Sequence, residues 1–150
     1  MTPSPLGNNT IVQIGLVVRQ IEASVQAWAA LLGIPPPPII VTDAVEQAHT
    51  EYRGGPTPAR AKLAFFHLGP VTLELIEPLG EPSTWHDQLA THGPSLHHLA
   101  FEVRGMSDRL AALAAHGLPL LQRGDYEGGR YAYLDGSDRF GAIVELLEND

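Results

Sequence analysis

Two parts of the chain show the same order of predicted elements, and this internal repeat limits the possible folds more than any other feature. Each part reads as a strand, an amphipathic helix and then further strands. The first strands align without gaps, as VQIGLVVR at 12–19 and HHLAFEVR at 97–104, and so do the last strands, as LELIE at 73–77 and VELLE at 144–148. Such a repeat predicts two similar modules packed around a pseudo-twofold axis.

The length and composition fit one domain that holds both modules. The chain has 150 residues, of which 44% are hydrophobic, as in an ordinary globular protein. Within a single domain 1–150 we place module one at about 10–79, a linker at about 80–95 and module two at about 96–148. The absence of cysteine excludes a disulfide scaffold, an iron–sulfur cluster, a zinc–thiolate site and a cysteine nucleophile.

Helical spacing of apolar residues predicts a helix at 21–32 in the first module and another at 107–116 in the second. A glycine follows each helix, as is usual where a helix ends. The linker contains a further helical patch at 84–92. The polar, turn-rich stretch 43–57 is predicted to be a mobile loop.

The charge balance excludes several classes of partner. Nine Lys and Arg residues against 17 Asp and Glu residues give a formal net charge of −8. Nucleic acids and anionic membranes both attract a basic footprint, so neither is an expected partner. No apolar run approaches the roughly 18 residues of a membrane span, and residues 1–10 lack the features of a signal peptide. We therefore expect a cytoplasmic protein.

Four polar residues in the repeated strands are difficult to explain by packing. Gln13 and His98 occupy the same position in the two first strands, and Glu74 and Glu145 occupy the same position in the two last strands. Each glutamate lies between two apolar neighbours. Because side chains alternate along a strand, each glutamate projects to the face opposite those neighbours.

This set of residue types indicates a divalent metal site. A carboxylate loses much hydration energy on burial, so charged residues on inner strands need a partner. One His, two Glu and one Gln supply nitrogen and oxygen ligands, and open positions would admit water or substrate. Taken singly, each glutamate could face solvent, and Gln13 could be a hydrogen-bonded core amide. Their coincidence at equivalent positions of the repeat favours the metal site.

Two further histidines, His67 and His97, lie on or beside the strands of the candidate site. His67 pairs with Thr72 across a hairpin turn and so shares a face with Glu74, which puts it within reach of the same cavity. A solvent-exposed histidine at a strand end is the alternative interpretation. By alternation His97 points away from His98 and is predicted to be structural.

Four segments carry a resemblance to a known family. They read VQIGLVVRQIEASVQAWAALLGI, FFHLGPVTLELIEPLGEPS, GPSLHHLAFEV and YAYLDGSDRFGAIVELLE, and they cover most of the chain from residue 11 onward. They resemble the vicinal oxygen chelate superfamily, which includes glyoxalases, bleomycin-resistance proteins and extradiol dioxygenases. Within it they are most similar to methylmalonyl-CoA epimerase-like proteins.

The resemblance implies an α+β fold of two βαβββ modules whose curved mixed sheets surround a shared cavity. It implies a divalent metal (Co, Ni, Zn or Mn) held by Gln13, Glu74, His98 and Glu145, with Glu145 acting also as a catalytic base. Gln13 departs from the His that is usual in the epimerases, and an amide oxygen is a weaker ligand than imidazole. A homodimer acting on a small-molecule substrate is also implied.

The activity implied is proton transfer next to a carbonyl, on an acyl thioester or oxo-acid. His67 is the candidate second catalytic base, because residues 61–66 lack the carboxylate found there in epimerases. Two alternatives are a glyoxalase I-like lyase, whose glutathione-binding Arg and Asn are missing here, and a metal-free binding or resistance protein. An extradiol dioxygenase would need His at position 13.

Overall fold

The computed structural model of the protein describes residues 3–150, so the first two of residues 1–10, the stretch that lacks the features of a signal peptide, lie outside it. The first half contains β1 (Gln13–Val17), α1 (Ile21–Leu32), β2 (Ile40–Val41), α2 (Val45–Ala48), β3 (Glu51–Tyr52), β4 (Gly55–Pro56), β5 (Arg60–Leu68) and β6 (Val71–Leu79). The second half contains α3 (Thr84–His92), β7 (Ser95–Glu102), α4 (Met106–Ala115), β8 (Leu120–Tyr126), β9 (Gly129–Leu134), α5 (Ser137–Phe140) and β10 (Ile143–Asn149).

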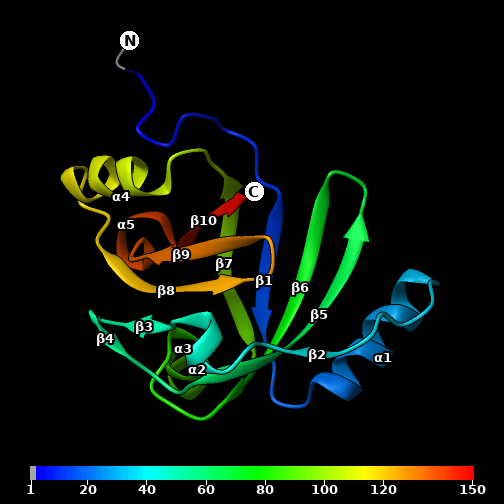
Figure 1. The fold of residues 1–150 in the computed structure, drawn as a ribbon. Helices are drawn as coiled ribbons and strands as arrows, with labels where there is room; N and C mark the ends of the chain where they lie inside the picture. The colour runs from blue at the N-terminus through cyan, green and yellow to red at the C-terminus, as the bar shows by residue number, and fades with distance from the viewer. Residues whose placement is uncertain (1–2) are drawn as a thin grey trace.

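All described strands belong to one curled mixed sheet in the order β2-β5-β6-β1-β7-β10-β9-β8-β3-β4 (Figure 1). The two first strands, β1 and β7, lie antiparallel at its centre. Each is flanked by the last strand of its own half in parallel, β6 beside β1 and β10 beside β7. This arrangement confirms the predicted α+β fold with two βαβββ halves related by a pseudo-twofold axis.

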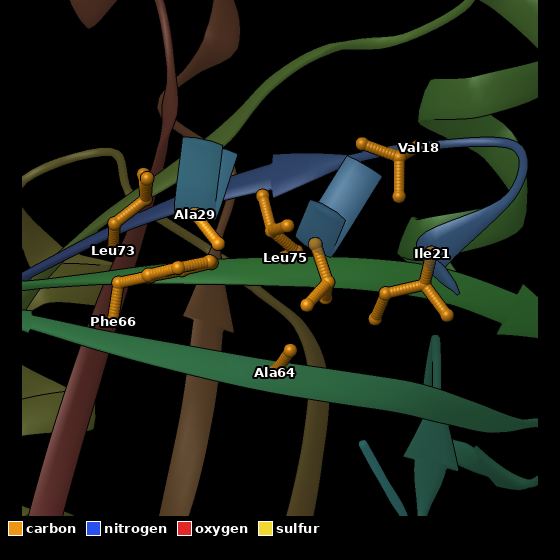
Figure 2. Packing of buried hydrophobic residues seen from close by; sticks show 8 residues of the cluster. Val18, Ile21, Ala29, Ala64, Phe66, Leu73 and Leu75 are labelled. Atoms are coloured by element: carbon orange, nitrogen blue, oxygen red, sulfur yellow. The ribbon is translucent and has the colours of Figure 1, made fainter. Parts of the chain in front are cut away.

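Helix α1 covers the outer face of the first half. Its residues Val25 and Ala29 are buried against Phe66 of β5 and against Leu73 and Leu75 of β6. Figure 2 shows Ala29 of α1 and the three sheet side chains meeting between helix and sheet. Burying a side chain as large as Phe66 or Leu75 stabilises the fold by about 1.5–3 kcal/mol. Because Leu73 and Leu75 face the helix, Glu74 between them faces the opposite, inner side of the sheet.

The pseudo-twofold symmetry extends to the start of the helix in each half. Oε1 of Glu77 accepts a hydrogen bond from the backbone N–H of Ile21 (2.9 Å), and Oε2 of Glu148 accepts one from Gly105 (2.6 Å). These glutamates lie near the ends of β6 and β10, at equivalent positions of the aligned last strands. A carboxylate there satisfies an N–H group that has no partner within the helix and interacts favourably with the helix dipole.

The prediction of a mobile loop at 43–57 is wrong. This segment forms α2 and the β3–β4 hairpin, and Glu51 of β3 pairs with Arg123 of β8 in the other half. The hydroxyl of Thr57 donates a hydrogen bond to the carbonyl of Pro82 (2.7 Å). Strands of two residues are too short to show alternation, so only the tertiary pairing identifies them.

The linker contains the predicted helix 84–92, which is α3, and this helix packs on the inner face of the sheet. Ser83 caps it by accepting a hydrogen bond from the N–H of His86 (2.9 Å). Trp85 is buried against Ile76 and Tyr133 from the two halves. Helix α3 therefore covers the inner face of the sheet next to the candidate site. None of the helices in residues 3–150 is long and apolar enough to cross a membrane.

Candidate functional site

The four polar residues singled out in the sequence come together on the four central strands. Each lies on the inner face of its own strand, and the strands β6, β1, β7 and β10 are consecutive in the sheet. The residues form two rows, each with a small residue on the middle strand: Glu74–Gly15–His98 and Gln13–Ala100–Glu145. Pseudo-twofold symmetry exchanges these rows, as the aligned repeats predicted.

Three oxygens converge on one nitrogen at the centre of the site. Nε2 of His98 lies 2.8 Å from Oε1 of Gln13, 3.2 Å from Oε1 of Glu145 and 3.4 Å from Oε1 of Glu74. A ring nitrogen carries at most one hydrogen, so it cannot donate to all three oxygens. The distance is shortest to Gln13, and the geometry there is that of a hydrogen bond.

Both glutamates consequently have a buried oxygen without a hydrogen-bond partner, Oε1 in each case. The residues are also sealed from solvent: His98 is 0% exposed, Glu145 3%, Glu74 6% and Gln13 9%. An unpaired buried carboxylate oxygen is costly and rare. Such atoms in a native site point to a proton or a cation as the missing partner.

Burial and charge shift the pKa values of this cluster. Burial raises the pKa of Glu74 to about 8, and the nearby Glu145 carboxylate raises it while His98 opposes the shift. Burial opposes the charged form of His98, but the carboxylates of Glu145 and Glu74 outweigh it and raise the pKa. Near neutral pH the metal-free cluster therefore holds its protons more firmly than isolated side chains would.

The prediction that His97 points away from His98 is wrong, because β7 contains a bulge. The pairing with β1 passes from Gly15 opposite His98 to Leu16 opposite Leu96, which leaves His97 unpaired. Both imidazoles then lie on the inner side, with Nδ1 of one 2.8 Å from Nδ1 of the other. An extra residue in a strand re-aims the side chains around it, and a sequence pattern based on alternation cannot detect this.

Aromatic side chains surround the histidines. The ring of Tyr133 lies against both imidazoles, with centroid distances of 4.8 Å to His97 and 5.2 Å to His98. Nε1 of Trp85 donates a hydrogen bond to the Tyr133 hydroxyl (3.0 Å). Trp85 is a site residue that the sequence analysis did not identify. Trp85 comes from α3, and no local pattern shows that this helix covers the site.

Gly15 is a further site residue that sequence reasoning missed. A Cβ atom at this position would lie 2.6 Å from Nε2 of His98 and closer still to two other ring atoms. The imidazole therefore occupies the space that a side chain on β1 would need. The available signal was a glycine inside an apolar strand, which is typical of a close approach.

Comparison with known proteins identifies the family. The Glyoxalase/Bleomycin resistance protein/Dioxygenase superfamily matches residues 12–133 of the chain. The chain belongs to this superfamily. The uncharacterized protein YqjC of Bacillus subtilis (strain 168) is 37% identical over 92 residues, which cover 59% of this chain and 66% of YqjC. The chain thus matches just under two thirds of the length of this relative.

Solved structures show the same fold. Hypothetical protein BH1468 from Bacillus halodurans C-125 is similar with a TM-score of 0.65 and 20% identity, over 94% of each chain. The methylmalonyl-CoA epimerase from Mycobacterium tuberculosis gives a TM-score of 0.64 and 19% identity, over 100% of this chain and 93% of that one. At these identities the likeness establishes the fold.

His67 lies apart from the four central residues of the site. His67 pairs with Thr72 as predicted, and its Nδ1 lies 3.2 Å from the Thr72 hydroxyl. It shares the inner side of the sheet with Glu74 but is exposed at the end of β5. Its role as a second base stays a prediction.

The donor set fits a divalent cation in its chemistry. It combines an imidazole nitrogen, an amide oxygen and two carboxylate oxygens that lack partners, which suits borderline and hard cations. Among residues 3–150, no group of three or more His, Cys, Asp or Glu side chains is already spaced to hold a metal ion. The donor atoms instead contact one another, and a bound cation would take the place of these contacts.

The raised pKa of Glu74 predicts how stability depends on pH without metal. Its pKa of about 8 in the folded state exceeds the ordinary value of 4.5, so between these values the folded state holds one more proton than the unfolded state. Stability therefore falls as pH rises through 8, and the raised pKa of His98 acts in the same direction. From about pH 7 to 9, Glu74 alone is expected to contribute a loss of about 1.4 kcal/mol.

When the protein is melted in the presence of a metal chelator, this loss of stability should appear as a decrease of roughly 4 °C in Tm from about pH 7 to 9. Glu74→Gln should remove most of the decrease, since glutamine does not titrate. His97, whose pKa is lowered by burial and by His98, affects stability only below its ordinary value of 6.5, outside the interval. A Tm that is constant or rises in the wild-type protein would contradict the assignment.

Proposed function

We propose that this protein is a divalent-cation-dependent isomerase of the epimerase type, which removes and returns a proton on the carbon next to a carbonyl group. The convergence of three oxygens on Nε2 of His98, with two of them unpartnered, carries the proposal. Membership of the superfamily and structural similarity to methylmalonyl-CoA epimerases support it. An acyl thioester or oxo-acid is the proposed substrate class.

Gln13, Glu74, His98 and Glu145 are the proposed ligands of the cation. When bound, the cation would polarise the substrate carbonyl and stabilise the negative charge that develops on its oxygen. Oε1 of Glu145 has no hydrogen-bond partner, so it is available to accept the proton from the adjacent carbon. Because His98 is fully buried, substrate access requires neighbouring side chains to move.

His67 is proposed as the group that exchanges a proton on the other face of the substrate. His67→Ala should then lower kcat for epimerisation by about 10²-fold, the lower end of the usual contribution of a general acid or base. Exchange of the substrate proton with solvent deuterium through Glu145 should persist. His49→Ala is the control, because His49 is also exposed but pairs with Asp125 away from the site. Unchanged kcat in His67→Ala would remove His67 as the second base.

The first test is cation binding by the purified protein. We expect about one equivalent of Zn, Ni, Co or Mn by elemental analysis, and a higher Tm when that metal is added. Glu74→Ala and His98→Ala should lose both effects. Methylmalonyl-CoA would then be tested in D₂O for incorporation of deuterium. If both variants still bind the metal like the wild type, Glu74 and His98 are excluded as ligands.

The alternative is a metal-free binding protein of the same fold. One observation favours it: the four side chains already contact one another, and the raised pKa values of Glu74 and His98 allow the cluster to balance its charge with protons. Absence of bound metal and of any metal-dependent Tm shift would favour this alternative. In either case we expect a cytoplasmic protein that forms a homodimer. Light scattering of the purified protein would measure its oligomeric state.

A further inference from the structure

A chain of hydrogen bonds leads from His98 away from the candidate metal site. Nδ1 of His98 lies 2.8 Å from Nδ1 of His97, and Nε2 of His97 lies 3.0 Å from the hydroxyl of Thr84. All three residues are buried, with exposed fractions of 0%, 1% and 4%. Thr84 is the first residue of α3, so the chain connects the centre of the sheet to the helix that covers it.

The geometry determines which atoms carry hydrogen if Nε2 of His98 binds a cation. That nitrogen must then be free of hydrogen, so the neutral ring carries its hydrogen on Nδ1. Two Nδ1 atoms at 2.8 Å share one hydrogen, which leaves Nδ1 of His97 as the acceptor. Neutral His97 then has its hydrogen on Nε2 and donates it to Thr84.

We propose that His97 is a positioning residue that, anchored by Thr84, sets the ring orientation and tautomer of His98 so that Nε2 faces the cation. The inference rests on the proposed function. The bulge in β7 makes the contact possible, because regular alternation would place the two imidazoles on opposite faces. Metal-bound histidines commonly need such a partner on the other ring nitrogen, and its loss lowers metal affinity by about 10–100-fold.

The test compares three variants by titrating metal-free protein with Zn²⁺ and Co²⁺ alone in a calorimeter. His97→Asn keeps an acceptor oxygen close to the position of Nδ1, and it should hold Kd within about threefold of wild type. His97→Leu has nearly the same shape as His97→Asn but no acceptor, and it should raise Kd by about 10–100-fold. Thr84→Val, which removes only the anchor of His97, should raise Kd by a smaller factor.

A spectroscopic measurement distinguishes positioning from general loosening of the fold. In Zn²⁺-loaded protein, nitrogen-15 NMR of the imidazoles should show His98 protonated on Nδ1 in the wild type and in His97→Asn. His97→Leu should lose the hydrogen-bonded Nδ1 proton signal. His92→Leu, the same change at an exposed residue of α3, is the matched control and should leave Kd and the signal unchanged.

The outcomes separate the two proposals. If wild type binds Zn²⁺ and His97→Leu binds it equally well, the positioning role is overturned while the proposed metal site stands. If wild type binds neither of these cations, and elemental analysis finds no bound Ni or Mn, the proposed function fails and the role of His97 fails with it. If His97→Leu does not fold, Thr84→Val decides: a wild-type Kd in that variant overturns the proposal.

Discussion

Replacing Glu145 with glutamine is expected to lower kcat by about 10³-fold while the protein remains folded. Glutamine has nearly the same volume, and its amide oxygen can still face His98. It cannot accept a proton from carbon, and it is a weaker cation ligand than a carboxylate. Proton exchange between substrate and D₂O, followed by mass spectrometry, measures the loss directly.

Glu102→Gln is the matched control for this prediction. Glu102 lies on the neighbouring strand β7 but is exposed, so the same chemical change there should leave turnover unchanged. Circular dichroism and Tm would establish that both variants fold. Turnover of Glu145→Gln within about tenfold of wild type would remove Glu145 as the base, since a positioned base contributes at least about 10²-fold.

Gly15→Ala is expected to destabilise the protein by about 3 kcal/mol, because overpacking a buried site forces side chains out of their preferred positions. For a chain of this length that corresponds to a decrease of roughly 10 °C in Tm. The new methyl group would overlap the imidazole of His98 and displace it from the three oxygens. Cation binding should therefore be lost together with stability.

Gly55→Ala provides the control for the glycine substitution. Gly55 lies in strand β4 with a negative φ, and no atom lies within 4 Å of the position that a Cβ would take. Its replacement should leave Tm and cation binding unchanged. If Gly15→Ala melts like the wild type and binds cation equally well, the close approach of His98 to β1 is not a feature of the protein in solution.

Pseudo-twofold symmetry shows why glycine stands at one position and alanine at the other. Gly15 lies between Glu74 and His98, whereas Ala100 lies between Gln13 and Glu145 in the equivalent row. The repeat alignment pairs Gly15 with Ala100 in the two first strands. Only the Gly15 row contains an imidazole, which is broad enough to cover the middle strand, and so only that row requires glycine.

Local patterns in the sequence were sufficient for most of the elements and for the four central residues. Helix α1 has the predicted bounds and ends at Gly33 in the left-handed conformation. Amphipathic periodicity and glycine caps act over a few residues, so a single stretch of sequence contains the whole signal. The convergence of Gln13, Glu74, His98 and Glu145 was predictable because the internal repeat carries information from one half to the other.

The surroundings that complete those residues into a site are visible only in the folded chain. The bulge that turns His97 toward His98, the pairing of β3 with β8 and the insertion of Trp85 over the inner face all depend on contacts between distant segments. The amino-acid pattern alone was enough to predict the two modules, their inner faces and the polar residues on them. The surroundings of those residues are formed by backbone and side-chain groups from distant parts of the chain. Which groups meet depends on the register and packing of the whole sheet rather than on local preference.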